Sequence, residues 1–222
     1  MKIISYNIHH CTQEKVDSVL RMQADIYILP EMSHPQKLRI PNGFMAYWRG
    51  NIETKGLGIV FRKDLECYVP DWTVNSQCYF LPLIAEKKLI IGAWPTKRPS
   101  NEPKGYPQIA LDGLAEYASR FEAYPTLIAG DFNLYNGQQD ETEMYSLKKV
   151  VSFLRQYGMT SIYHYWYGEE MGKESQATYY HQFKKDQQFF LDYTFSNIPV
   201  KDYILFDWNP RFSDHVAQCI EI

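Results

Sequence analysis

The feature that most constrains the fold of this chain is a succession of short apolar segments, each bounded by Gly, Pro, Asn or Asp. They are rich in β-branched and aromatic residues, which is the pattern of β-strands. Eleven such segments occur, at residues 2–8, 25–30, 44–49, 57–62, 78–84, 88–94, 126–130, 177–182, 188–195, 202–206 and 215–221. Three longer segments carry apolar residues at helical spacing, at residues 12–24, 107–122 and 143–157. Many strands with few long helices predict two sheets packed together with helices outside, in a single domain over residues 1–222.

Polar residues end or interrupt these strand-like segments at several places along the chain. These polar residues are Asn7, Glu31, Asp131, Asp192 and Asp214. A carboxylate at the edge of a buried strand is costly unless it is paired or bound to a metal. Each residue alone has an ordinary explanation, such as a strand cap, a paired buried acid or an Asx turn. Their recurrence at strand ends predicts that they converge on one rim of the sandwich.

The residue types in this group indicate a hard cation and a phosphate ester. Carboxylates combined with Asn suit Mg²⁺ or Mn²⁺. The four cysteines form no CxxC pair, so we expect reduced thiols and no zinc knuckle. His215 directly follows Asp214, and a lone histidine beside an aspartate suits acid–base chemistry or charge stabilisation on a phosphate.

The same residues lie in motifs that resemble those of the endonuclease/exonuclease/phosphatase superfamily, in the order in which that family has them. This family includes deoxyribonuclease I-like nucleases, abasic-site endonucleases, sphingomyelinases and inositol polyphosphate 5-phosphatases. The motifs are Ile4-Ser5-Tyr6-Asn7, Leu29-Pro30-Glu31, Gly56-Leu57-Gly58-Ile59-Val60-Phe61, Ala129-Gly130-Asp131-Phe132-Asn133, Thr178-Tyr179-Tyr180, Leu191-Asp192-Tyr193-Thr194-Phe195 and Ser213-Asp214-His215. The resemblance covers essentially the whole chain. It implies an α/β fold, a four-layer αββα sandwich with two mixed sheets face to face and helices outside.

The resemblance also implies a metal site. By position, Glu31 would be the principal metal ligand, while Asn7 and Asp214 would help to hold the metal or its waters. Some relatives carry an aspartate two residues after the first asparagine, where this chain has His9. His9 either ligates a softer metal such as Mn²⁺ or lines the cleft. One or two metal ions, Mg²⁺ or Mn²⁺, fit this set.

Catalytic roles follow from the resemblance in the same way. Asp131 would orient or deprotonate the attacking water, and Asn133 would grip the phosphate. His215 would contact the scissile phosphate and be held by Asp192. A cation and an imidazole would then neutralise the charge on the phosphoryl oxygens while Asp131 aims the nucleophile.

One loop departs from the family pattern. Many relatives place a phosphate-contacting His or Tyr after the sixth strand, where this chain has Trp94. An indole donates one hydrogen bond but cannot act as an acid or a base. The phosphate contact is therefore expected from Trp94 itself or from Lys97, Arg98 or Tyr106 in the loop that follows.

The composition of the chain narrows the range of expected substrates. The formal net charge is −3 and no Lys/Arg-rich run occurs, which disfavours long duplex DNA. We expect phosphodiester hydrolysis of nucleic acid or a nucleotide, with single strands favoured because bases stack on aromatic side chains. Two alternatives stay open: a phosphatase or phosphodiesterase for small esters such as sugar or inositol phosphates, and an inactive binding module.

The sequence begins directly with a strand-like segment and contains no long apolar run. It therefore shows neither a signal-peptide pattern nor a membrane-spanning segment. We expect a cytoplasmic protein that neither enters a membrane nor depends on an obligate protein partner.

Overall fold

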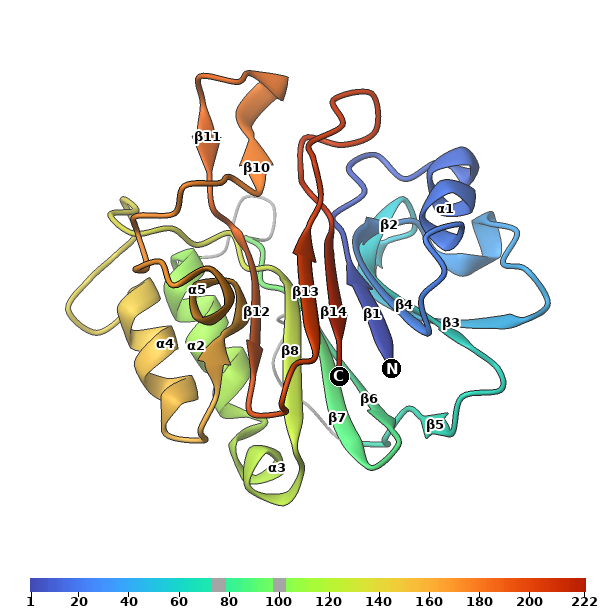
Figure 1. The fold of residues 1–222 in the computed structure, drawn as a ribbon, viewed down its shortest axis with the longest axis horizontal. Helices are drawn as coiled ribbons and strands as arrows, with labels where there is room; N and C mark the ends of the chain where they lie inside the picture. Colours follow the sequence, from blue (N-terminus) through green and yellow to red (C-terminus); the bar gives the residue numbers. More distant parts are fainter. Residues whose placement is uncertain (73–78, 98–102) are drawn as a thin grey trace.

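Two six-stranded β-sheets form the centre of the molecule (Figure 1). The computed structural model describes residues 1–72, 79–97 and 103–222. The first sheet has the order β13-β14-β1-β2-β4-β3, with β1 Lys2–Ser5, β2 Ile26–Met32, β3 Phe44–Ile52, β4 Lys55–Arg62, β13 Asp202–Leu205 and β14 Gln218–Glu221. The second has the order β5-β6-β7-β8-β12-β9, with β5 Cys67–Tyr68, β6 Tyr79–Ala85, β7 Lys88–Trp94, β8 Thr126–Asp131, β9 Thr160–Ser161 and β12 Asp192–Ser196. Both sheets are mixed, because β1–β2 and β7–β8 are parallel pairs among antiparallel ones.

The hydrophobic core lies between the two sheets. Strands β2 and β4 of the first sheet pack against β6 and β7 of the second. Their described apolar side chains are buried, as the nearly continuous apolar runs of these segments predict for strands covered on both faces. The sheets approach closely at Gly92, where an added Cβ would lie 3.1 Å from Ile28 Cγ2 and 3.3 Å from Ile59 Cδ1.

Helices cover the outer faces of the two sheets (Figure 1). Helix α1 (Gln13–Leu20) begins after Thr12, whose hydroxyl accepts the Lys15 N–H, and packs Val16 and Val19 against the first sheet. On the other side lie α2 Tyr106–Ala115, α3 Ala118–Ala123, α4 Leu147–Arg155 and α5 Ile162–Tyr167. The layers run helix, sheet, sheet, helix, which confirms the predicted four-layer sandwich. None of the described helices is both long and apolar enough to cross a membrane.

Several predicted boundaries were wrong. The single helix predicted over residues 107–122 is two helices, α2 and α3, separated at Tyr117. Tyr117 has φ −99° and ψ 0° at the start of α3, and its buried ring sends the hydroxyl to Phe80 O at 3.4 Å. Packing of this side chain therefore outweighs the helical pattern. The helix predicted over 143–157 begins only after Ser146, whose hydroxyl caps the Lys149 N–H.

The segment around residues 177–195 also differs from the prediction of two long strands. It forms a short hairpin, β10 (Tyr179–Tyr180) with β11 (Gln188–Phe189), and only then enters β12. The hairpin projects from the top edge of the sandwich in Figure 1. An isolated bridge between Tyr179 and His215 ties its base to the segment before β14.

Strand direction brings the predicted polar residues to this same edge. In the register of β8 with β12, Asp131 lies opposite Asp192. In the register of β1 with β14, Ser5 lies opposite Gln218, so Asn7 and His215 follow and precede their strands at one edge. A hydrogen bond of 2.9 Å from Asn7 Nδ2 to Asp131 Oδ2 joins the two sheets there.

Gly130, which precedes Asp131, lies where no side chain fits. Its φ is 151°, and an added Cβ would lie 1.9 Å from Ala93 O on β7. We expect Gly130→Ala to lower the free energy of unfolding by at least about 2 kcal/mol through backbone strain and overpacking. Urea unfolding would measure this loss. Gly43→Ala, where an added Cβ meets nothing within 4 Å, is the control. Equal stability of the two variants would contradict the expectation.

Candidate active site

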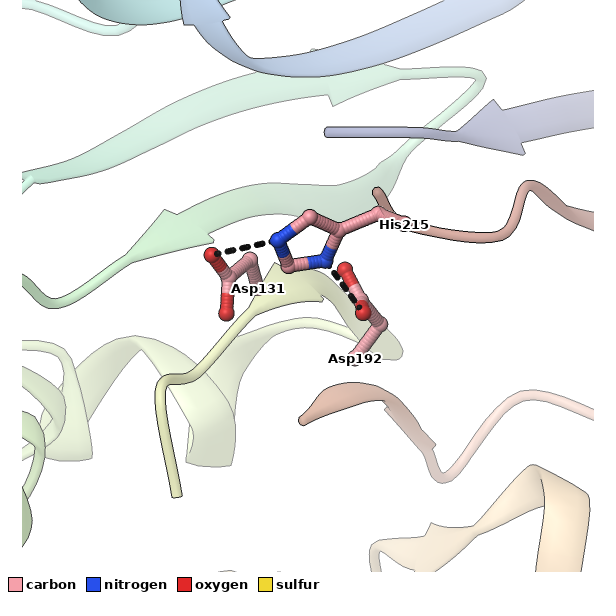
Figure 2. A group of neighbouring side chains, drawn as sticks. All are labelled: Asp131, Asp192 and His215. Carbon is pink, nitrogen blue, oxygen red and sulfur yellow. Dashed lines mark hydrogen bonds and ion pairs between the residues drawn. The ribbon is translucent and has the colours of Figure 1, made fainter. Parts of the chain in front are cut away.

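The centre of the candidate site is the imidazole of His215, which lies between two carboxylates (Figure 2). His215 Nδ1 is 2.8 Å from Asp192 Oδ2, and His215 Nε2 is 3.8 Å from Asp131 Oδ2. All three residues are buried. They come from the start of β12, the end of β8 and the segment before β14, so only the folded sandwich brings them together.

Two hydroxyl groups fix the backbone around this cluster. Ser213 Oγ donates to Asn7 O at 2.7 Å and accepts the His215 N–H at 3.0 Å. Thr178 Oγ1 accepts the backbone N–H groups of Leu191 and Asp192 at 2.8 and 2.9 Å. Both residues were noted only as parts of motifs, because hydroxyl contacts to distant backbone cannot be read from the sequence.

The amide of Asn7 contacts Asp131, His215 and Glu31. Besides its bond to Asp131, Asn7 Nδ2 lies 3.5 Å from Glu31 Oε1 and 3.3 Å from His215 Nε2. Asn7 Oδ1 accepts the backbone N–H of His9 at 3.0 Å, which fixes the orientation of the amide. Asn7 thus orients Asp131 through a side chain that is itself fully buried.

Glu31 enters the site from a β-bulge. The register of β2 with β4 shifts between Pro30 and Met32, and Glu31 takes a positive φ of 67°. This turns the carboxylate toward Asn7 and toward Lys55, whose Nζ is 3.0 Å from Glu31 Oε1. Burial opposes ionisation of Glu31, but the neighbouring ammonium of Lys55 outweighs it and lowers the Glu31 pKa below its ordinary value.

Asp214 presents an oxygen that is not hydrogen-bonded. Asp214 Oδ1 is buried and has no hydrogen-bond partner in the described part of the chain. His9 Nδ1 lies 3.2 Å from it but outside hydrogen-bond geometry. Burial lowers the pKa of His9, which favours the neutral imidazole that ligates metals. A buried carboxylate oxygen of this kind is a fitting ligand for a hard cation.

Burial and mutual proximity shift the pKa values of the central trio. Burial raises the pKa of Asp131 to about 7 and also raises that of Asp192. Burial opposes the charge on His215, but the two aspartates outweigh it and raise the His215 pKa to about 9. The 2.8 Å bond assigns the ion pair to His215 and Asp192. Asp131 is then the carboxylate poised to exchange a proton near neutral pH.

Tyr179 is a further neighbour that the sequence did not single out as a site residue. Its ring centroid lies 4.7 Å from that of His215. Burial, with Asp214 next in importance, raises the pKa of Tyr179 to about 12, so its hydroxyl stays neutral. That hydroxyl is 2.9 Å from His181 Nδ1, a contact within the hairpin.

The predicted substrate-binding residues lie on another side of the site, where some of them already contact other side chains. Lys97 Nζ is 2.8 Å from Asp140 Oδ2 and 5.0 Å from the ring centroid of Tyr106. Trp94 is buried, with Lys55 Nζ 5.4 Å from its ring centroid. The predicted residue Arg98 lies outside the described residues.

Asn133, predicted to grip the phosphate, takes a positive φ of 53°. Its backbone N–H donates to Asp131 Oδ1 at 2.9 Å. Its side-chain Nδ2 donates to Pro95 O at 3.1 Å and so connects the loop after β7 to the site. In this arrangement, Asn133 orients Asp131 from the side opposite to Asn7.

Similarity of this chain to known proteins lies in its fold. No known family model and no curated protein sequence matches this chain. Among solved structures, a 3'-5' exonuclease (NExo) from Neisseria meningitidis matches with a TM-score of 0.72 and 17% identity, covering 100% of this chain and 99% of that one. Another Neisseria NExo structure, a 3' phosphatase bound to a product DNA hairpin, has a TM-score of 0.71 and 17% identity, covering 100% and 98%.

Two further structures are similar over their full length. An AP endonuclease from Archaeoglobus fulgidus has a TM-score of 0.72 and 14% identity, covering 99% of this chain and 98% of that one. The endonuclease domain of TRAS1, a telomere-specific non-LTR retrotransposon, has a TM-score of 0.70 and 13% identity, covering 100% and 97%. The chain therefore has the fold of the endonuclease/exonuclease/phosphatase superfamily.

Proposed function

We propose that this protein is a divalent-metal-dependent phosphodiester hydrolase that acts on nucleic acid or nucleotide-like substrates. The observation that carries the proposal is the buried imidazole of His215, bonded to Asp192 on one side and facing Asp131 on the other. A histidine and a carboxylate with raised pKa values in one polar cluster are the groups that acid–base hydrolysis requires. The shared fold with DNA nucleases supports this choice of reaction.

The donor set fits a hard cation. Asp131, Asp192 and His215 place possible ligand atoms within 4.8 Å of one another, but a cation between them would replace the proton shared by His215 and Asp192. Glu31 and Asp214, with Asn7 and His9 beside them, offer carboxylate oxygens without that cost. We therefore assign Mg²⁺ or Mn²⁺ to Glu31 and Asp214. A cation held there would neutralise charge on the phosphate.

The side chains of this protein would then have distinct tasks. Asp131, oriented by Asn7 on one oxygen and by the Asn133 N–H on the other, accepts a proton from the attacking water. The Asp192 carboxylate holds the Nδ1 proton of His215, so the Nε2 side faces the substrate with a fixed ring orientation. His215 Nε2–H then stabilises the negative charge that grows on the phosphoryl oxygens.

The hairpin β10–β11 favours a single strand as substrate. Two of its aromatic side chains, Phe183 and Phe189, are 40% and 36% exposed. Phe183 lies 5.3 Å from the ring of His9, so this stacking surface adjoins the metal side of the site. Bases of an unpaired strand stack on such rings without regard to sequence. Together with the net charge of −3, this supports short single strands over long duplexes.

A substrate panel tests the proposal. Purified protein with Mg²⁺ or Mn²⁺ would be incubated with a single-stranded oligonucleotide, a 3'-phosphorylated oligonucleotide, a plasmid, bis-p-nitrophenyl phosphate, and sugar and inositol phosphates. We expect the single-stranded oligonucleotide and the diester to be hydrolysed fastest. Faster turnover of the sugar or inositol phosphates would favour a small-ester phosphatase. Hydrolysis of none of these compounds would indicate a binding module and contradict the proposal.

A further inference from the structure

Lys55 places an ammonium group at the site that neither the motifs nor the proposed mechanism uses. It begins β4 and follows the tight turn that joins β3 to β4. Its Nζ lies 3.0 Å from Glu31 Oε1 and 5.4 Å from the ring centroid of Trp94. The side chain of Lys55 is 45% exposed, whereas that of Glu31 is 12% exposed. The ammonium therefore lies on the solvent side of the carboxylate cluster.

The bulge in β2 explains why this lysine reaches the site. Met32 pairs with Gly56 and Pro30 with Leu57, so Glu31 is the extra residue beside the start of β4. A Cβ at Gly56 would lie 2.3 Å from the Trp48 ring, so the chain next to Lys55 is packed against its neighbours. The lysine is thus fixed at its base, while its four-carbon stem leaves the ammonium free to shift by a few ångströms.

The net charge of the carboxylate cluster favours an ammonium group beside it. Glu31, Asp131, Asp192 and Asp214 are four carboxylates, and His215 is one cation. Even with one divalent ion bound, the fully ionised cluster would keep a negative charge and repel a phosphate anion. The ammonium of Lys55 offsets this charge beside Glu31, and that of Lys15, which donates to Ile8 O at 3.0 Å, is a second ammonium in the field of Glu31 and Asp214. Among the described residues, the oxygen contact of Lys55 is Glu31 Oε1, and an ammonium has three N–H donors.

We propose that Lys55 is a phosphate-binding residue, whose ammonium donates to a non-bridging oxygen of the substrate phosphate while it remains beside Glu31. This inference rests on the proposed function for the identity of the substrate. What it states about the protein is that Lys55 binds a phosphate anion. Lys97 is less suited to this role, because its ammonium pairs with Asp140, which is not one of the four carboxylates of the cluster.

Isothermal titration calorimetry with inorganic phosphate and Mg²⁺ tests the inference by binding alone. We expect Lys55→Met to weaken phosphate binding about tenfold or more, because a charge-assisted hydrogen bond is lost. Lys55→Arg should retain most of the affinity. Lys87→Met is the matched control: Lys87 is exposed and precedes β7, whereas Trp94 ends that strand at the site. Unfolding temperatures of all variants would show that each is folded.

The outcomes separate this inference from the proposed function. Phosphate affinity of Lys55→Met equal to that of the wild type would overturn the inference, as would the absence of phosphate binding to the wild type. If Lys55 merely neutralised Glu31, Lys55→Met would keep its phosphate affinity and change its Mg²⁺ affinity. If the wild type binds phosphate through Lys55 but hydrolyses no ester, the proposed function fails and the phosphate site stands. With bis-p-nitrophenyl phosphate as substrate, we expect a higher KM in Lys55→Met.

Discussion

Replacing Asp131 by asparagine is expected to reduce the kcat for phosphodiester hydrolysis at least about 100-fold, the usual contribution of a positioned acid or base. Asparagine has nearly the same shape but cannot accept a proton. Its amide could still accept one of the two hydrogen bonds that Asn7 Nδ2 and the Asn133 N–H donate to Asp131. The fold should therefore survive while the proton acceptor is lost.

Controls separate chemistry from folding in this experiment. Asp207→Asn makes the same chemical change at an exposed position and should leave kcat unchanged. His215→Ala should lose at least about as much activity as Asp131→Asn. The double variant should lose little more than either single one, because groups that act together are not additive. Wild-type kcat in both single variants would overturn the assignment of the site.

Removal of the divalent metal should reduce hydrolysis at least as much as Asp131→Asn does. We expect EDTA to abolish hydrolysis, and Mg²⁺ or Mn²⁺ to restore it, because the proposed site places a cation at Glu31 and at the Asp214 oxygen that accepts no hydrogen bond from the described residues. Added metal should also raise the unfolding temperature, since a ligand present at 100 times its Kd stabilises a folded protein by about 2.7 kcal/mol.

Variants of the two ligands show whether the metal lies at this place. Glu31→Gln and Asp214→Asn should each need more Mg²⁺ for half-maximal activity and show a smaller thermal shift. Glu53→Gln, at an exposed glutamate paired with Lys37, serves as the control and should behave as the wild type. Hydrolysis that persists unchanged in EDTA would refute metal dependence altogether.

The sequence predicts the layers of this fold and the edge at which its polar residues meet, because both follow from local patterns. The strand that ends in Gly130-Asp131 can be recognised without its neighbours, whereas the strand predicted over 188–195 placed Asp192 in its interior and the structure begins β12 there. The direction of the two strands then decides how they pair, and the structure shows them paired antiparallel. The convergence of Asn7 with Asp131 was predicted on the same ground.

What the sequence does not predict depends on contacts between distant segments. The ion pair of Lys55 with Glu31 requires a bulge that shifts the register by one residue, and no local pattern marks it. Helix α5 lies outside the three segments predicted as helices, and its run of aromatic residues has modest helix propensity. Packing of α5 against β12 and β13 stabilises this helix where its own propensity is modest. Tyr117 divides a predicted helix for the same reason.

The hydrogen bond from Ser213 to the carbonyl of Asn7 has a consequence for the order of events during synthesis. It joins residues that are 206 positions apart, and His215 lies two residues after Ser213. A nascent chain that has emerged only as far as β13 has its carboxylates Glu31, Asp131 and Asp192 but lacks the imidazole. Such long-range closure is slow compared with local folding. Under the proposed function, a newly made chain would gain hydrolytic activity only after β14 has been inserted beside β1, because His215 precedes that strand and reaches Asp192 when it pairs.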